Sequence, residues 1–301
     1  MKQFIFMVVL IPYQMLNVPL HLSYRKYEDT MSALPTTAYK DITLEHKPHQ
    51  GYSIITMHKT PANTMTLTFL KQLAQALHEV ETSPTSQALI ITSSTNIFSA
   101  GMDLREFLSP DPKQFRTLWN TFQDVLIGLY STRLLTVALV NGSAVGGGCA
   151  LALCCDYRLA VEGGWKMGVN AVHLGMPVPQ IVVRLLVNVL GQSVAEKFLL
   201  SGRLCVGSSE ALQYGFVDRV VKACDSTQTV STQMLKWLSI PTDGRAMTKC
   251  FLRRHHVVEF QRLKVEDTAL FLKVVQNPTF QQHVRQYSND VLGKKKNSSK
   301  L

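Results

Sequence analysis

The chain has 301 residues, of which 46% are hydrophobic and 17% charged, and it carries a formal net charge of +10. This composition is that of a globular protein long enough to bury a substantial core, and it excludes a fibrous or low-complexity chain. The positive charge favours an anionic small ligand or a basic oligomer rim, but no aromatic-and-basic motif points to nucleic acid, so we expect no nucleic-acid partner. The six cysteines form no CxxC pair and no cluster with histidine at metal spacing. They therefore indicate core thiols in a reducing compartment and no metal site.

Residues 1–35 are expected to lie outside the fold. Residues 3–22 are apolar, but Pro12 and Pro19 interrupt them, and the longest unbroken run is far shorter than the roughly 20 residues of a bilayer span. We therefore expect no integral membrane span. The segment is either a signal or transit-like sequence or upstream sequence that precedes a start at Met31.

Strand and helix patterns alternate through the front two-thirds of the chain. Strands are predicted at 53–58, 88–93, 135–140, 157–161 and 216–221, and helices at 66–81, 112–130, 148–154, 195–200, 208–214, 227–238 and 243–255. The alternation indicates an α/β fold with a mostly parallel sheet and crossover helices. We therefore divide the chain into a β/α core at 36–225, a helical region at 226–290 and a polar tail at 291–301.

Two glycine-containing loops carry the strongest functional signal. The first is NIFSAGMDLREF at residues 96–107, with a helix opening at Asp103, and the second is NGSAVGGGCALALCCDYRLA at residues 141–160. A glycine-rich turn at the start of a helix exposes backbone N–H groups at the positive end of the helix dipole. Neither loop matches GxxxxGK[ST] or GxGxxG, which argues against a nucleotide cradle.

Together the two loops resemble the crotonase family of enoyl-CoA hydratases and isomerases, over about residues 43–289. The segments HKTPANTMTLTFL at 58–70 and EALQYGFVDRVV at 210–221 extend the resemblance. Within the family, GVNAVHLGM at 168–176 and SIPTDGRAMTKCFLRR at 239–254 are similar to the Δ3,Δ2-enoyl-CoA (dodecenoyl-CoA) isomerase of fatty-acid β-oxidation. The resemblance implies a crotonase-type β/α spiral core with a C-terminal helical region, assembled as a homotrimer or hexamer.

The resemblance also implies a site for an acyl-CoA thioester and no separate cofactor, since CoA is part of the substrate. The thioester carbonyl would lie in an oxyanion hole formed by the backbone N–H groups of Met102 and Gly147. Removing a proton α to a thioester makes an enolate, and two preorganised donors stabilise its oxygen. The substrate would lie along these donors and six further residues, namely Ala62, Ala100, Gly101, Asp103, Leu104 and Asn170.

The expected carboxylates are missing from this implied site. The family positions that carry an acid correspond to Ala150 and Ala171 and, in other branches, to Pro179. A methyl group cannot transfer a proton, so hydration is not expected. His173 is the nearest replacement base, because its pKa is ordinarily near 6.5; the alternative is that it faces away from the site. Two readings follow: an isomerase with a displaced base, or a non-catalytic acyl-CoA-binding relative.

Other polar residues near the loops have simpler expected roles. Asp103 is expected to cap the helix that it opens, Asp156 to accept structural hydrogen bonds, and Glu162 to be solvated. Cys149 follows the glycines on an apolar helix and is expected to be packed, so it is no nucleophile.

The last three residues, Ser299, Lys300 and Leu301, form the tripeptide that the peroxisomal import receptor reads. They follow a polar tail that leaves them accessible. We therefore expect a peroxisome-type organelle, with the mitochondrion as the alternative.

Overall fold

The computed structural model describes residues 36–298, with side chains described as far as residue 288. The predictions for residues 1–35 and for Ser299, Lys300 and Leu301 lie outside the described residues. None of the helices within the described range combines the length and the apolar character that a membrane crossing requires.

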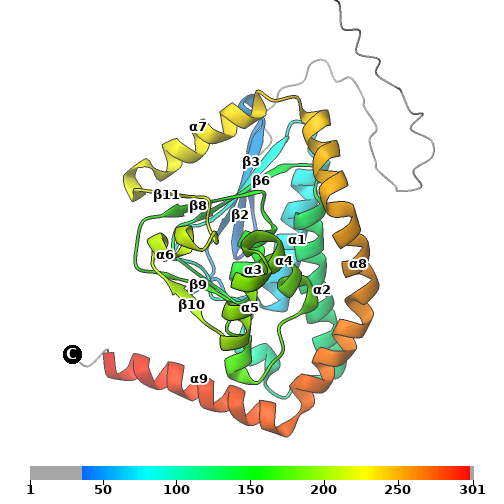
Figure 1. Cartoon of the computed structure of the whole chain (residues 1–301), viewed down its shortest axis with the longest axis vertical. Coiled ribbons are helices and arrows are strands. Elements are labelled where there is room, and N and C mark those ends of the chain that lie inside the picture. The colour runs from blue at the N-terminus through cyan, green and yellow to red at the C-terminus, as the bar shows by residue number, and fades with distance from the viewer. Residues whose placement is uncertain (1–35, 299–301) are drawn as a thin grey trace, which may run out of the picture. The chain divides into compact units, whose positions relative to one another are not determined.

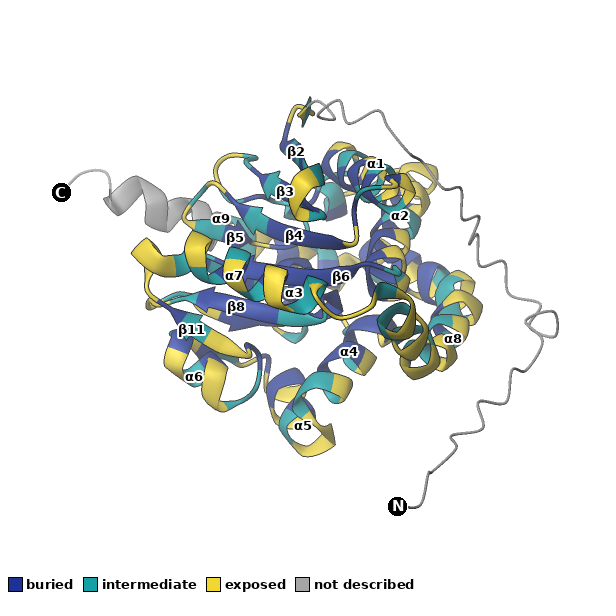
Figure 2. Ribbon diagram, turned by 90° about the horizontal axis from the view of Figure 1, so that it is seen from above, coloured by how far each residue is buried: buried dark blue, intermediate teal, exposed yellow. Residues whose placement is uncertain are grey.

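A seven-stranded sheet forms the centre of the described unit, and Figure 2 shows its strands side by side. In spatial order its strands are β1 (Thr37–Ala38), β2 (Ile42–Lys47), β3 (Tyr52–Met57), β4 (Ala88–Ser93), β6 (Leu135–Val140), β8 (Tyr157–Val161) and β11 (Arg219–Val221). Every pairing from β3 to β11 is parallel. The predicted α/β class with a mostly parallel sheet is confirmed.

Strands of a second, four-stranded sheet directly precede the glycine loops. Its order is β10 (Leu204–Val206), β9 (Lys166–Gly168), β7 (Ser143–Val145) and β5 (Ile97–Ser99), with β5, β7 and β9 parallel. The carboxyl ends of parallel strands meet at one edge of a sheet. The segments that follow these three strands, at 100–103, 146–148 and 169–179, are therefore brought to the same edge.

Helices cover the two sheets and supply the main core. They are α1 (Leu67–Thr82), α2 (Pro112–Ser131), α3 (Gly147–Cys154), α4 (Gln180–Leu190), α5 (Gln192–Ser201) and α6 (Ser208–Gln213). Along β4, Leu89 and Ile91 pack in the main core, whereas Ala88 and Ile90 pack in a second cluster on the opposite face. This period of two is that of a strand buried on both sides.

Three helices form the C-terminal region (Figure 1), which confirms the predicted helical region. α7 (Ser226–Leu238) buries Val230 and Met234 against the second face of the sheet. α8 (Thr242–Gln276) runs beside α2, and α9 (Pro278–Ser298) follows it. α8 extends 21 residues beyond the predicted end at 255, because its second half continues a helical pattern that the sequence interpretation did not include.

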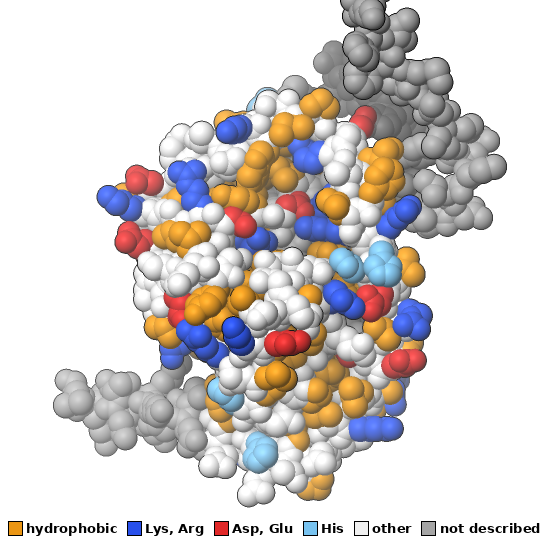
Figure 3. Space-filling view, in the orientation of Figure 1, with side chains coloured by type: hydrophobic (Ala, Val, Ile, Leu, Met, Phe, Trp, Pro, Cys, Tyr) orange, Lys and Arg blue, Asp and Glu red, His pale blue; other side chains and the backbone are white. Residues whose placement is uncertain are grey.

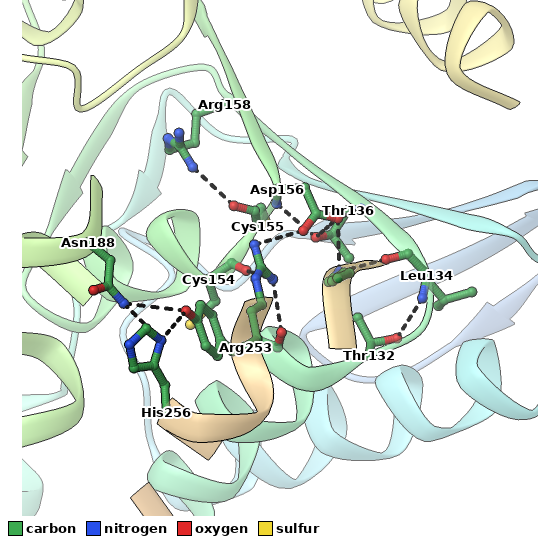
Figure 4. Close-up of polar contacts among 12 residues, drawn as sticks. Thr132, Leu134, Thr136, Cys154, Cys155, Asp156, Arg158, Asn188, Arg253 and His256 are labelled. Carbon is green, nitrogen blue, oxygen red and sulfur yellow. Dashed lines mark hydrogen bonds and ion pairs between the residues drawn. The ribbon is translucent and has the colours of Figure 1, made fainter. Parts of the chain in front are cut away.

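Asp156 joins α8 to the sheet (Figure 4). Its carboxylate accepts from the Thr136 backbone N–H at 2.8 Å, and it forms ion pairs of 2.8 Å with both Lys249 and Arg253 of α8. Arg253 also donates to the Cys154 carbonyl oxygen at 3.3 Å. The predicted structural role of Asp156 agrees with these contacts.

Several local predictions need correction. The helix predicted to open at Asp103 is present as a short 3-10 helix, Leu104–Phe107. Helix α4 and strand β2 were not predicted, although β2 buries every second residue as a half-buried strand does. The cysteines are core thiols at 149, 154, 155 and 205, but Cys224 is exposed and Cys250 is half-buried.

Candidate functional site

The segment that contains Met102 lies along residues 62–65. Ala100 N–H donates to the Ala62 carbonyl oxygen at 3.0 Å, Met65 N–H donates to the Gly101 carbonyl oxygen at 2.8 Å, and Asp103 N–H donates to the Met65 carbonyl oxygen at 3.1 Å. In this parallel bridge, Met65 bonds to the neighbours of Met102, so the N–H of Met102 points to the opposite side. That N–H has no partner among the described residues.

Gly147 supplies a second unpaired donor. It is the first residue of α3, where an N–H has no intrahelical acceptor. An ideal Cβ built on Gly101 would lie 2.8 Å from Gly147 N, so the Gly101 Cα lies directly beside that nitrogen. Met102 N is two covalent bonds from the Gly101 Cα. The unpaired N–H groups of Met102 and Gly147 therefore lie in one small region.

The surroundings of these donors are apolar. Gly147 is buried, and an ideal Cβ on it would lie 2.9 Å from Met65 Sδ and 3.2 Å from Phe122 Cε2. Hydrogen bonds to a developing negative charge are stronger in such an environment than in water. The arrangement suits a carbonyl oxygen that gains charge.

Asp103 is buried beside the donors, at 5% exposure. Its Oδ1 accepts from the backbone N–H of Arg105 at 3.1 Å, which confirms the capping prediction, and its Oδ2 accepts from Thr64 Oγ1 at 3.0 Å. The hydrogen bonds from the Arg105 side chain are the main reason that the pKa of Asp103 falls to about 2, although burial acts in the opposite direction. The carboxylate is therefore an ionised structural group, and no sequence pattern indicates its pairing with Thr64.

The residues expected to line CoA lie on the outer side of this segment. Ala100 is exposed, while Ala62 and Leu104 are half-buried. The exposed guanidinium of Arg105 is adjacent, and the face of the molecule in Figure 3 carries Lys and Arg side chains spread among hydrophobic ones rather than gathered in one field. A backbone hydrogen bond joins Ala100 to Ala62, and the binding of CoA by Ala62, Ala100 and Leu104 stays a prediction.

The loop at 169–179 forms a third part of the site. Gly146 N–H donates to the Gly168 carbonyl oxygen at 2.9 Å, which places the start of this loop next to the glycine turn. Asn170 and Ala171 are half-buried, and the Asn170 side chain has no recorded partner in the described chain. Asn170 remains available to a ligand, and Ala171 offers only a methyl group.

His173 lies on the exposed side of the same loop. Its Nε2 is 2.9 Å from the Ser201 carbonyl oxygen at the end of α5. A carbonyl only accepts, so Nε2 carries the proton and Nδ1 of the neutral ring keeps its lone pair. No described contact places His173 against Met102 or Gly147, and its role as a base stays a prediction.

The other positions expected to carry an acid are apolar and buried. Ala150 lies at 0% exposure within α3, and Pro179 is buried immediately before α4. Burial raises the pKa of the Cys149 thiol far above its ordinary value, which is unfavourable for a nucleophile. Among the side chains that the structure describes, there is no group of three or more His, Cys, Asp or Glu arranged to hold a metal ion.

One buried acid was not found by sequence reasoning. Asp267 of α8 is 3% exposed, accepts from Trp119 Nε1 at 3.3 Å through Oδ2, and leaves Oδ1 without a partner in the described structure. Burial raises its pKa, although the hydrogen bond from the Trp119 side chain acts in the opposite direction. Asp267 and Gln180, the first residue of α4, line one small cavity.

Comparison with known proteins places the chain in a family. The model described as enoyl-CoA hydratase/isomerase matches residues 48–291. The mitochondrial enoyl-CoA delta isomerase 1 of Mus musculus is 30% identical over 86% of this chain and 90% of its own, and that of Homo sapiens is 29% identical over 82% of each. The human mitochondrial delta3-delta2-enoyl-CoA isomerase structure superposes with a TM-score of 0.82 at 28% identity, covering 85% of this chain and all of that one.

More distant structures share the fold. An enoyl-CoA hydratase from Bacillus halodurans has a TM-score of 0.71 at 21% identity, over 85% of this chain. The resemblance stated from the two glycine loops is thereby confirmed, as is the crotonase-type fold. The chain belongs to the enoyl-CoA hydratase/isomerase family.

Proposed function

We propose that this protein binds acyl-CoA thioesters and is a Δ3,Δ2-enoyl-CoA isomerase of fatty-acid β-oxidation. The observation that carries the proposal is the pair of unpaired N–H groups, from Met102 and Gly147, at the start of a buried helix. They form an oxyanion hole for the thioester carbonyl oxygen. Each such donor is worth roughly 3 kcal/mol of barrier in enzymes that have been dissected by mutation.

The isomerisation is a 1,3-proton shift. A base removes a proton from C2 of a 3-enoyl thioester, the electron pair passes to the carbonyl oxygen as an enolate, and the conjugate acid returns a proton to C4. The double bond thereby moves from C3–C4 to C2–C3. In the proposal His173 is the base, through the lone pair of Nδ1, because Nε2 is occupied by the Ser201 carbonyl.

A second candidate function has its own support. Ala150, Ala171 and Pro179 leave the loop and the helix without a carboxylate. A protein with the hole intact and no base would bind acyl-CoA without converting it.

Turnover of a trans-3-enoyl-CoA decides between the two functions. The conjugated product absorbs in the ultraviolet, and the wild-type protein is compared with the variants Ala171→Glu and His173→Ala. The isomerase proposal expects turnover by wild type that His173→Ala abolishes. Turnover by Ala171→Glu alone identifies a binding protein with an intact pocket, and calorimetry that shows no affinity for any acyl-CoA rejects both functions.

The proposed assembly is a homotrimer or hexamer. α8 exposes Phe251, Val258 and Val265, at 56%, 65% and 76%, and residues seven apart lie on nearly the same face of a helix. Sedimentation at micromolar concentration is expected to show an oligomer, and Val258→Asp is expected to weaken it. A wild-type monomer at that concentration contradicts the assembly.

One observation supports a mitochondrial location and another supports a peroxisomal one. The curated relatives are named as mitochondrial proteins, which supports the mitochondrial alternative. The terminal Ser299, Lys300 and Leu301 favour import by the peroxisomal receptor. Microscopy of an N-terminally tagged chain, with and without Leu301, separates the two, because only peroxisomal import depends on that residue.

A further inference from the structure

The direction of the Met102 N–H depends on a short segment with little intrinsic rigidity. Gly101, immediately before it, has a φ of +82°, a region that glycine enters freely. Only three backbone hydrogen bonds hold residues 100–103 against residues 62–65. A donor must point at the substrate oxygen to stabilise it. A small displacement of the donor lowers the reaction rate substantially. Side-chain contacts therefore contribute to holding this segment in place, beginning with Ser99 Oγ, which accepts from the Gly101 N–H at 3.1 Å and donates to the Asn63 carbonyl oxygen at 2.8 Å.

The Asp103 carboxylate joins the two segments immediately beside the donor. Thr64, which precedes Met65, donates to Oδ2 at 3.0 Å, and Asp103 itself follows Met102. Arg105 donates to Oδ1 through Nε at 2.9 Å and to Oδ2 through Nη2 at 2.6 Å. Lys59 Nζ donates to the carbonyl oxygen and hydroxyl of Thr64, at 2.6 and 3.0 Å, and lies 3.9 Å from Oδ2.

These contacts form a clamp across the bridge between Met65 and Met102. Both carboxylate oxygens are used, and the side chain of Asp103 is only 6% exposed. Lys59 is also mostly buried, at 15%, so the positive charge behind Thr64 is partly desolvated and strengthens the clamp. An amide at position 103 has one acceptor oxygen instead of two, and it would turn N–H donors toward Thr64 or Arg105.

We propose that Asp103 is a positioning residue that fixes the direction of the Met102 N–H and thereby polarises the bound thioester carbonyl. The inference rests on the proposed function, because it assigns Asp103 a part in the oxyanion hole. Asp103 acts through the backbone, and its carboxylate does not itself bind the substrate.

The test measures carbonyl polarisation and not only activity. Octanoyl-CoA carrying 13C at the carbonyl cannot be isomerised, and hydrogen bonds from an oxyanion hole move its NMR resonance downfield. Wild type, Asp103→Asn and Thr64→Val are compared, with affinity measured by calorimetry. The matched control is Asp111→Asn: Asp111 also caps a helix, accepting from the backbone N–H groups of Lys113 and Gln114 at 3.0 and 2.9 Å, but it lies at the start of α2.

We expect a downfield shift on binding to wild type and to Asp111→Asn, and a shift much closer to the free thioester for Asp103→Asn. Thr64→Val removes one contact of the clamp without removing the charge, and it is expected to give an intermediate shift. If Asp103→Asn does not fold, Thr64→Val alone tests whether the clamp determines the carbonyl shift. A full shift in the folded variants overturns the inference and leaves the proposed function standing. Wild type that binds octanoyl-CoA without a shift also overturns it, whereas wild type that binds no acyl-CoA contradicts the proposed function itself.

Discussion

The Cα of Gly101 lies directly against the backbone nitrogen of Gly147. An ideal Cβ on Gly101 would lie 2.8 Å from that nitrogen and 2.6 Å from the Val145 carbonyl oxygen, closer than real Cβ contacts. Gly101 of the first loop is therefore required to be glycine by the second loop, and Gly148 of the second by the first, since an ideal Cβ on Gly148 would lie 2.3 Å from the Ser99 carbonyl oxygen. The contact between them, more than the turn within either, brings the N–H groups of Met102 and Gly147 together.

Gly147→Ala is expected to weaken acyl-CoA binding. The new methyl group would lie 2.9 Å from Met65 Sδ and 3.2 Å from Phe122 Cε2, so the side chains or the start of α3 must move. Calorimetry with octanoyl-CoA measures the loss. Gly128→Ala is the control: its Cβ meets nothing within 4 Å on an exposed part of α2. There alanine is expected to stabilise the helix by up to about 1 kcal/mol without changing affinity. Unchanged affinity in Gly147→Ala would count against the proposed hole.

Asp103 is expected to stabilise the fold in a pH-dependent way. Its pKa is about 2 in the folded protein against an ordinary 3.8, so the unfolded chain binds more protons between these values. The stabilisation is therefore complete above the unfolded pKa and is lost as the pH falls through the folded one. It amounts to about 2 kcal/mol at neutral pH. Urea unfolding of wild type and Asp103→Asn at pH 7 and pH 3 should show a smaller difference at pH 3; an equal difference at both contradicts the assignment.

The contribution of Asp267 to the free energy of unfolding is expected to change with pH in the opposite direction to that of Asp103. Burial raises its pKa above the ordinary value, so the folded protein binds more protons than the unfolded chain in the interval between the two. The cost of burying the carboxylate therefore grows as the pH rises through that interval. Asp267→Asn removes the charge and keeps an acceptor for Trp119 Nε1. In urea unfolding, the variant should gain stability relative to wild type between pH 4 and pH 7, and a constant difference would argue against a raised pKa.

Asp156→Asn is expected to lower the free energy of unfolding by about 3 kcal/mol. The change leaves Lys249 and Arg253, whose side chains are only 10% and 17% exposed, without their shared anion. Glu45→Gln is the control, because its ion pair with Lys47 is solvated and such pairs contribute less than about 1 kcal/mol. Equal losses in urea unfolding for the two variants would show that the Asp156 contacts are no stronger than a surface pair.

Local patterns in the sequence were sufficient for much of the fold, whereas Met102 and Gly147 were predicted as donors from the family resemblance. The strand at 88–93 is bounded as predicted, and α3 begins one residue before its predicted start, at Gly147. These features depend on neighbouring residues, whose spacing is visible in the sequence. Strand β9 was not predicted, because three residues are too few for a period to be recognised.

The partners of the buried acids could not be predicted in the same way. Asp103 and Thr64 are 39 residues apart, and Trp119 and Asp267 are 148 apart. Only the folded chain brings such groups together, and no spacing in the sequence marks them. The same limit applies to His173, whose contact with the Ser201 carbonyl crosses 28 residues.

The Asp156 contacts also determine how the molecule opens. One carboxylate holds the Thr136 amide of β6 and two cations of α8, so α8 cannot detach without uncovering a charge beside the central sheet. Local fluctuations that release the C-terminal helices alone are therefore suppressed, and β6 and the first half of α8 belong to one cooperative unit. Amide hydrogen exchange in both segments should then proceed by the same opening, with the same dependence on denaturant.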